Sequence, residues 1–277
     1  MLGALIIVFR EVIEAGIIVG ILLAVTKGVP GRGGWVAAGV GAGVAGAALL
    51  AVFAEQISSA LAGLGQEVFN ATVLAVAVVM LAWHNIWMAR HGRQLAAQMK
   101  DVGAAVAMGS RPLVAVAIVV AIAVLREGSE IVLFLYGLVI AGGSSTGSLI
   151  AGGLIGLLLG CGVTTLTFFG LVTIPNRYLF GVTTALLTFL AAGLAAQSVV
   201  FLQQAGILTA LEGTVWDTSA ILSDTSLLGR ALHTLIGYTD QPSGMQLLVY
   251  MLTLITIYGL TRAFKSPPPA KRPTVTA

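Results

Sequence analysis

Two copies of one charged motif lie within apolar stretches of this 277-residue chain. Arg10-Glu11-Val12-Ile13-Glu14 is the first copy, and Arg126-Glu127-Gly128-Ser129-Glu130 is the second. In a helix, residues three and four apart share a face, so the two glutamates of each motif align and each arginine can pair with the second glutamate. Two facing motifs would gather four carboxylates and two guanidiniums, about −2 in net charge. Such a group predicts a cation site built from hard oxygen ligands.

The motif residues are therefore the candidate functional residues. The predicted metal ligands are Glu11, Glu14, Glu127 and Glu130, and the residues expected to hold these carboxylates are Arg10 and Arg126. The alternative is that the motifs are interhelical salt bridges that only hold the helices together. A charge at the centre of a bilayer costs at least about 2.5–3.5 kcal/mol to insert. Two copies of one charged pattern, in the only two charged helices, favour a binding site over that alternative.

The elements that position these residues are predicted to be transmembrane helices. The chain is 58% hydrophobic and only 9% charged, whereas soluble domains carry about 25% charged residues. Its apolar blocks have the length of about 20 residues that crosses a bilayer as helix. The prediction is an all-α membrane protein, with one polytopic domain over residues 1–263 and a disordered cytoplasmic tail over 264–277. Seven helices are expected, at about 2–26, 34–54, 71–89, 113–141, 148–172, 178–202 and 245–263.

The distribution of basic residues predicts the orientation of these helices. Lysine and arginine concentrate in alternate connections and after the last helix, which places the N-terminus outside and the C-terminus in the cytoplasm. Both motifs then lie between the membrane midplane and its outer half. The first three helices and the next three would form two inverted repeats, followed by a seventh helix, with the motifs at the repeat interface.

Two further patterns concern packing and the long outer loop, residues 203–244. Glycines at four-residue spacing, Gly39 with Gly43 and a second run at 152, 156 and 160, predict small helix faces that allow close approach. Within the outer loop, residues 227–236 have helical periodicity, with Ser226 placed as N-cap and Gly237 as C-cap. A short amphipathic helix on the outer surface is expected there.

Acidic residues gather on the predicted outer side and suggest a surface that concentrates cations. Glu67, Asp217 and Asp224 are the candidate capture residues. The alternatives are that Glu67 and Asp224 are ordinary solvated loop acids and that Asp217 is a helix N-cap.

The histidines bear on whether the chain is an enzyme. A membrane-embedded metalloenzyme would need a nucleophile or a histidine cluster near the carboxylates, but His84, His91 and His233 are expected at or near membrane surfaces on different sides. We interpret His84, beside Trp83, as an interfacial histidine rather than a ligand. These positions favour a transporter.

The paired motifs resemble the signature of the oxidase-dependent iron transporter family, and the resemblance extends over nearly the whole chain. Supporting segments are residues 66–70 (QEVFN), 190–196 (LAAGLAA), 216–222 (WDTSAIL), and 237–238 (GY) followed by 242–243 (PS). The chain departs from the family at Val12, where glycine is usual. It departs again at Asn70, where bacterial members often carry a second acid, and this weakens the case for an outer iron site at Glu67.

The resemblance implies seven helices, an outside N-terminus and the four motif glutamates as ligands. It implies an iron permease of a bacterial cytoplasmic (inner) membrane, with iron ions as transported substrate and no cofactor, and not an enzyme. An extracytoplasmic iron oxidase or iron-delivery protein is a candidate partner, and no nucleic acid is expected. Because carboxylate sites discriminate weakly among cations, lead or manganese is the alternative substrate.

Overall fold

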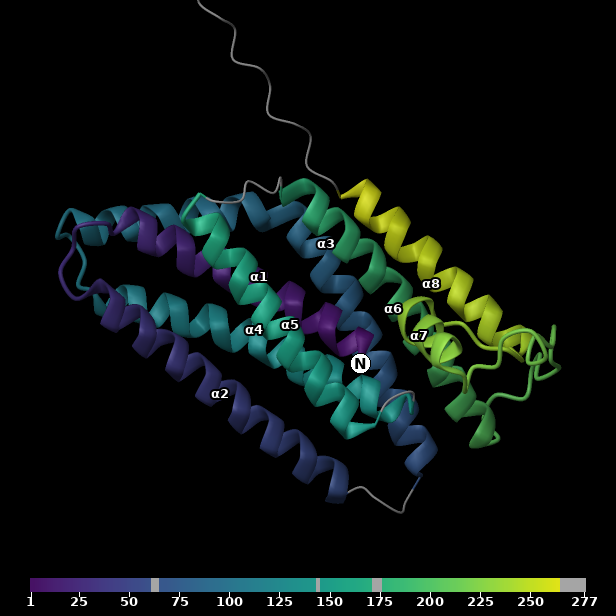
Figure 1. Ribbon diagram of the computed structural model, residues 1–277. Helices are drawn as coiled ribbons and strands as arrows, with labels where there is room; N and C mark the ends of the chain where they lie inside the picture. Colours follow the sequence, from purple (N-terminus) through teal and green to yellow (C-terminus); the bar gives the residue numbers. More distant parts are fainter. Residues whose placement is uncertain (61–64, 143–144, 171–175, 265–277) are drawn as a thin grey trace, which may run out of the picture.

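The computed structural model describes residues 1–60, 65–142, 145–170 and 176–264. Within these residues the regular structure is helical, apart from an isolated bridge between Thr214 and Ser243. The helices are α1 (Leu2–Val25), α2 (Arg32–Ala60), α3 (Gln66–Ala107), α4 (Val114–Ile140), α5 (Thr146–Phe168), α6 (Asn176–Gln204), α7 (Leu227–Ile236) and α8 (Gly244–Ala263) (Figure 1). The tail predicted to be disordered falls, from residue 265 onward, outside the described residues.

The long helices suit a membrane. Five of the described segments are long and apolar enough to cross a bilayer: Arg32–Phe53, Gln66–Met88, Thr146–Phe168, Gly181–Gln204 and Gly244–Ala263. The two motif helices, α1 and α4, have comparable lengths of 24 and 27 residues, but each carries the three charges of its motif. Large apolar side chains face outward, as on α5, where Leu158 is 71% exposed. The chain is therefore a multi-pass membrane protein.

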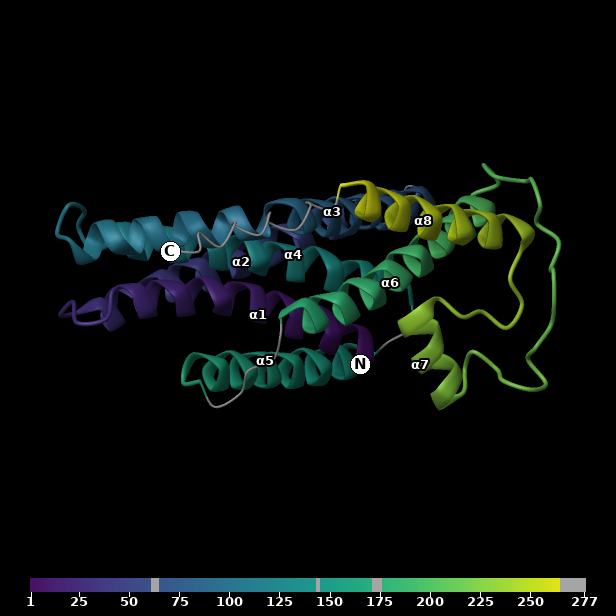
Figure 2. The same ribbon diagram turned by 90° about the horizontal axis from the view of Figure 1, so that it is seen from above.

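When α1–α3 and α4–α6 are compared, the second helix of each set packs against the first helix of the other set. α2 lies along α4, and α5 lies along α1, while α3 packs against α6 and α6 against α8 (Figures 1 and 2). α1 and α4 also contact each other, and both contact α3. This arrangement brings the two motif helices together in the interior.

Glycine faces allow these close pairings. On α2, a Cβ at Gly43 would lie 2.8 Å from the carbonyl oxygen of Ala121 on α4. On α5, a Cβ at Gly156 would lie 2.5 Å from the carbonyl oxygen of Leu5 on α1. Since real Cβ atoms are essentially never found so close to other heavy atoms, only glycine permits these approaches. The predicted small faces are confirmed.

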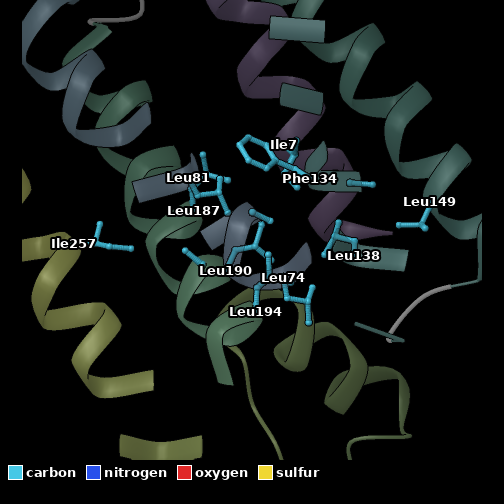
Figure 3. Close-up of a cluster of buried hydrophobic side chains, with 13 residues drawn as sticks. Ile7, Leu74, Leu81, Phe134, Leu138, Leu149, Leu187, Leu190, Leu194 and Ile257 are labelled. Atoms are coloured by element: carbon cyan, nitrogen blue, oxygen red, sulfur yellow. The ribbon is translucent and has the colours of Figure 1, made fainter. Parts of the chain in front are cut away.

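Two buried hydrophobic clusters lie on opposite sides of the motifs along the helices. The first includes Ile7, which precedes the motif in α1, and Phe134, which follows it in α4 (Figure 3). The second includes Leu22, which follows the motif in α1, and Val120, which precedes it in α4. Because α1 and α4 carry these residues in opposite order, the charged residues are enclosed between two apolar layers.

The structure corrects the predicted connection over residues 90–112. α3 does not end at residue 89 but continues to Ala107, giving a helix of 42 residues. Its C-terminal part packs Val106 into the second hydrophobic cluster with Leu22 and Val116. That tertiary packing stabilises a helix that hydropathy alone does not reveal, because charged residues interrupt it. Glu67, expected in a loop, lies in the first turn of α3.

The short helix predicted in the long loop is confirmed as α7. The Ser226 side chain accepts a hydrogen bond from the backbone N–H of Gly229 at 2.9 Å, and Gly237 ends the helix in the left-handed conformation with φ 70°. α7 packs against α6 and the start of α1 (Figure 2).

Candidate metal centre

The charged side chains of the α1 motif are buried and pair with one another. Arg10, Glu11 and Glu14 are all buried, as the alignment of these positions on one helical face requires. Arg10 Nη1 donates to Glu11 Oε1 at 2.8 Å, and Arg10 Nη2 lies 2.7 Å from Glu14 Oε1. One guanidinium therefore neutralises part of the charge on both carboxylates.

The α4 motif has the same sequence pattern but a different geometry. Arg126 Nε lies 3.5 Å from Glu130 Oε1 and 3.9 Å from Glu127 Oε1, longer than the contacts of Arg10. The Arg126 side chain is 33% exposed, against 2% for Arg10. Its guanidinium carbon lies 4.3 Å from the ring centroid of Trp87 on α3, a cation–π distance. Glu127 and Glu130 are buried, and their arginine lies farther from them than Arg10 does from the α1 carboxylates.

α3 supplies His84, which the sequence interpretation placed at the membrane surface. The structure corrects the environment expected for His84: its side chain is only 3% exposed and lies between the two motifs rather than at an exposed surface. Its Nε2 lies 3.2 Å from Glu14 Oε2, and its Nδ1 contacts Glu130 Oε2. His84 thus connects the two motifs. A signal was present, since His84 continues the buried row of Ala77 and Leu81 at helical spacing.

Four buried side chains from three helices offer ligand atoms to one point. Glu11, His84, Glu127 and Glu130 each present an oxygen or nitrogen, and these atoms lie within 4.8 Å of one another. Among the residues that the structure describes, Glu11 Oε2 and Glu127 Oε2 are buried without a hydrogen-bond partner. Three carboxylates and one imidazole form a donor set that suits a divalent transition-metal ion. Glu14 adjoins this group through His84 without being one of its four members.

The three candidate capture residues lie apart from this centre. Glu67 and Asp217 are exposed, and Asp224 is half-buried. Within the described residues they do not form a cluster of three metal-ligating groups. Asp217 does not cap a helix; its Oδ1 accepts from the Ser219 hydroxyl at 2.6 Å and from the Ser219 backbone N–H at 2.9 Å. These hydrogen bonds, and one from Gln241, hold the pKa of Asp217 below its usual range.

Comparison with known proteins identifies the family of the chain. Residues 1–265 match the iron permease FTR1 family. The ferrous iron permeases EfeU of Shigella sonnei (strain Ss046) and Escherichia coli O157:H7 are each 30% identical over 268 residues, covering 95% of this chain and 95% of theirs. A protein of Escherichia coli K12 named as a putative inactive ferrous iron permease EfeU is 29% identical over 269 residues, with the same coverage. No solved structure matches the chain. Since the match covers nearly every residue, including both motifs, the chain belongs to the iron permease FTR1 family.

Proposed function

We propose that this iron permease moves ferrous iron across the membrane through the buried carboxylate centre of α1 and α4. Iron is its transported substrate, and the protein is a transporter rather than an enzyme. The observation that carries the proposal is the convergence of Glu11, Glu127 and Glu130 on one point, with carboxylate oxygens left unpartnered. Glu14 belongs to the same site, and Arg10 and Arg126 limit its negative charge. The names of the relatives motivate the ferrous form.

The proposed topology has seven spans, with α1 and α4 joining the five apolar ones, the N-terminus outside and the C-terminus in the cytoplasm. α1–α3 and α4–α6 are proposed as inverted repeats. The exchanged pairing of α2 with α4 and α5 with α1 supports this. So do the glycine contacts: Gly39 meets Ala117, nine residues before Arg126, and Gly152 meets Met1, nine residues before Arg10. The membrane is proposed to be a bacterial inner membrane.

The two hydrophobic clusters are proposed to act as the barriers on either side of the site. Iron enters from the side of Ile7 and Phe134 and leaves past Leu22 and Val120, so each cluster must open in turn. Moving a charge across the membrane potential yields about 2.3 kcal/mol per 100 mV. A divalent ion therefore gains roughly 4.6 kcal/mol per 100 mV, which favours uptake.

Capture is proposed to begin on the outer side, at Glu67, Asp217 and Asp224. An extracytoplasmic iron oxidase or iron-delivery protein is the proposed partner there. Because these acids act by long-range attraction, neutralising all three should weaken uptake at low iron more than at saturating iron, and less as salt rises.

Uptake of radiolabelled iron into proteoliposomes tests the function. Ferrous iron, kept reduced, and ferric iron are supplied separately, with manganese and lead as competitors. Glu11→Gln and Glu127→Gln should insert and fold but lose uptake, whereas Asp101→Asn, at an exposed position near the end of α3, should transport like the wild type. Normal ferrous uptake by both glutamine variants would refute the proposal.

A further inference from the structure

We propose that His84 is a ligand of the transported ferrous ion and that Glu14 acts through His84 rather than on the metal. This rests on the proposed function and assigns different roles to corresponding residues of the two motifs. Glu130 and Glu14 hold the same place in their motifs, yet Glu130 belongs to the four-residue ligand group and Glu14 does not.

The two ring nitrogens of His84 face different partners. Nδ1 lies against Glu130, a member of the ligand group, and Nε2 lies 3.2 Å from Glu14 Oε2. A neutral imidazole can give only one nitrogen to a metal, and the other then carries the proton. The geometry assigns Nδ1 to the metal and Nε2–H to Glu14.

Glu14 is in turn fixed by Arg10, whose Nη2 lies 2.7 Å from Glu14 Oε1. Arg10, Glu14 and His84 thus form a buried chain that ends at the metal. Metal-bound histidines are commonly oriented in this way by a carboxylate on the second nitrogen, which sets the tautomer and strengthens the ligand. This role accounts for the burial of Arg10, which has no counterpart at the more exposed Arg126.

An imidazole ligand changes which ions the site prefers. Carboxylate oxygens alone suit magnesium, calcium and manganese, whereas imidazole suits ferrous iron and the later divalent metals. His84 therefore serves as the specificity residue that favours ferrous iron over manganese in a site otherwise made of oxygen ligands.

X-ray absorption spectroscopy at the iron edge, with metal-binding measurements on the purified full-length protein under anaerobic conditions, tests the proposal. Wild-type protein loaded with ferrous iron should show the multiple-scattering signal of one imidazole. His84→Gln, whose amide can still donate to Glu14, should lose that signal. Its ferrous dissociation constant should rise by at least the roughly 10- to 100-fold that is typical for loss of a residue that only orients a metal ligand, while manganese binding changes far less. Glu14→Gln should keep the imidazole signal but lose part of the ferrous preference.

The matched control is His91→Gln on the same helix, where the His91 ring stacks on Trp87 outside the ligand group; it should behave like the wild type. Absence of an imidazole signal in the wild type would overturn the proposal whether or not any variant folds. An unchanged ratio of ferrous to manganese affinity in His84→Gln would also overturn it. If Glu127→Gln abolishes binding in that case, the carboxylate centre stands and only the role of His84 fails. If Glu127→Gln binds iron normally, the proposed function itself fails.

Discussion

The first variable position of the Arg-Glu-x-x-Glu motif shows how the sizes of single residues are matched between packed helices. Gly128 on α4 faces Ala47 on α2, and a Cβ at Gly128 would lie 2.7 Å from the Ala47 Cβ. At the corresponding position α1 has Val12, and it faces Gly160 on α5, where an added Cβ would lie 2.8 Å from Val12 Cγ1. In the α4–α2 pair the larger residue, Ala47, lies on the partner helix. In the α1–α5 pair the larger residue, Val12, lies on the motif helix. The departure from the family pattern at Val12 is offset by Gly160.

Exchanging the sizes tests this match. Gly160→Ala should destabilise the protein by about 1–3 kcal/mol, because it overpacks the α1–α5 contact. Adding Val12→Gly recreates the glycine–alanine pair found at Gly128 and Ala47, and should recover much of that loss despite a glycine cost of about 0.5–1 kcal/mol in a helix. Thermal unfolding in detergent measures both. A double variant no more stable than Gly160→Ala would argue against the match.

The two motif arginines should differ in their importance for folding. Arg10 is buried beside two carboxylates, so Arg10→Gln strands buried charge and should cost about 3–5 kcal/mol. Arg126 makes longer contacts and is partly exposed, so Arg126→Gln should reduce uptake more than stability. Expression level, thermal unfolding and uptake, measured side by side, separate the two. Combining Arg10→Gln with Glu14→Gln should restore folding, while iron uptake stays well below that of the wild type; wild-type uptake by that double variant would contradict a role for Glu14 in the site.

At the residue scale, the sequence was sufficient to identify six charges but not their unequal roles. The motifs stood out because charges are costly in a membrane. His84 can be neutral and lies outside the motifs, so the cost of placing a charge in a membrane did not mark it as a functional residue. Arg126 turns toward Trp87 because α3 packs beside α4. The spacing of residues within α4 carries no information about that packing.

Among the elements, the C-terminal part of α3 is the one that most needs its tertiary partners. Val106 is buried in the second hydrophobic cluster, while Met108, two residues later, is 77% exposed. Val106→Asp places an unpaired carboxylate in that cluster and should destabilise the protein by about 3 kcal/mol or more. Met108→Asp is the control and should be close to neutral. Equal thermal stability of the two variants would mean that residues 90–107 do not pack as described.

A helix could be predicted from the sequence where its own residues account for its stability. Apolar runs such as those of α2, α5 and α8 are recognisable because lipid selects them by composition. α7 was recognisable from its caps. The extension of α3 was not, because its apolar contacts Leu95, Met99 and Val106 are separated by small, polar and charged residues, and their partners lie in α1 and α4.

For the whole molecule, labelling of single cysteines tests the proposed orientation. The native Cys161 is exposed and is first replaced by alanine. Cysteines at Glu67 and Asp217 should then react with an impermeant reagent from outside, and one at Asp101 only after the membrane is opened. Labelling of Asp101→Cys in intact cells would reverse the proposed orientation.

The sequence predicted the apolar helices and the two motifs, but the exchanged pairing of the halves could not be predicted from it. Glycine spacing predicted that Gly39, Gly43 and the α5 face are contact surfaces, but it did not indicate which helices they contact. Only the assembled structure shows that Gly43 meets α4 and that Gly156 meets α1.

The pairing of α1 with α5 has a consequence for biosynthesis. α1, which carries three charges, is made before α5, but α5 is the helix whose glycines its backbone meets, and it follows more than a hundred residues later. α1 lacks the charges that complete its polar cluster until α4 is made, and it lacks its glycine-lined partner until α5 follows. On the proposed seven-span topology, we therefore expect newly made α1 to be a poor substrate for the insertion machinery. Its stable insertion is expected only after the second half of the chain has been synthesised.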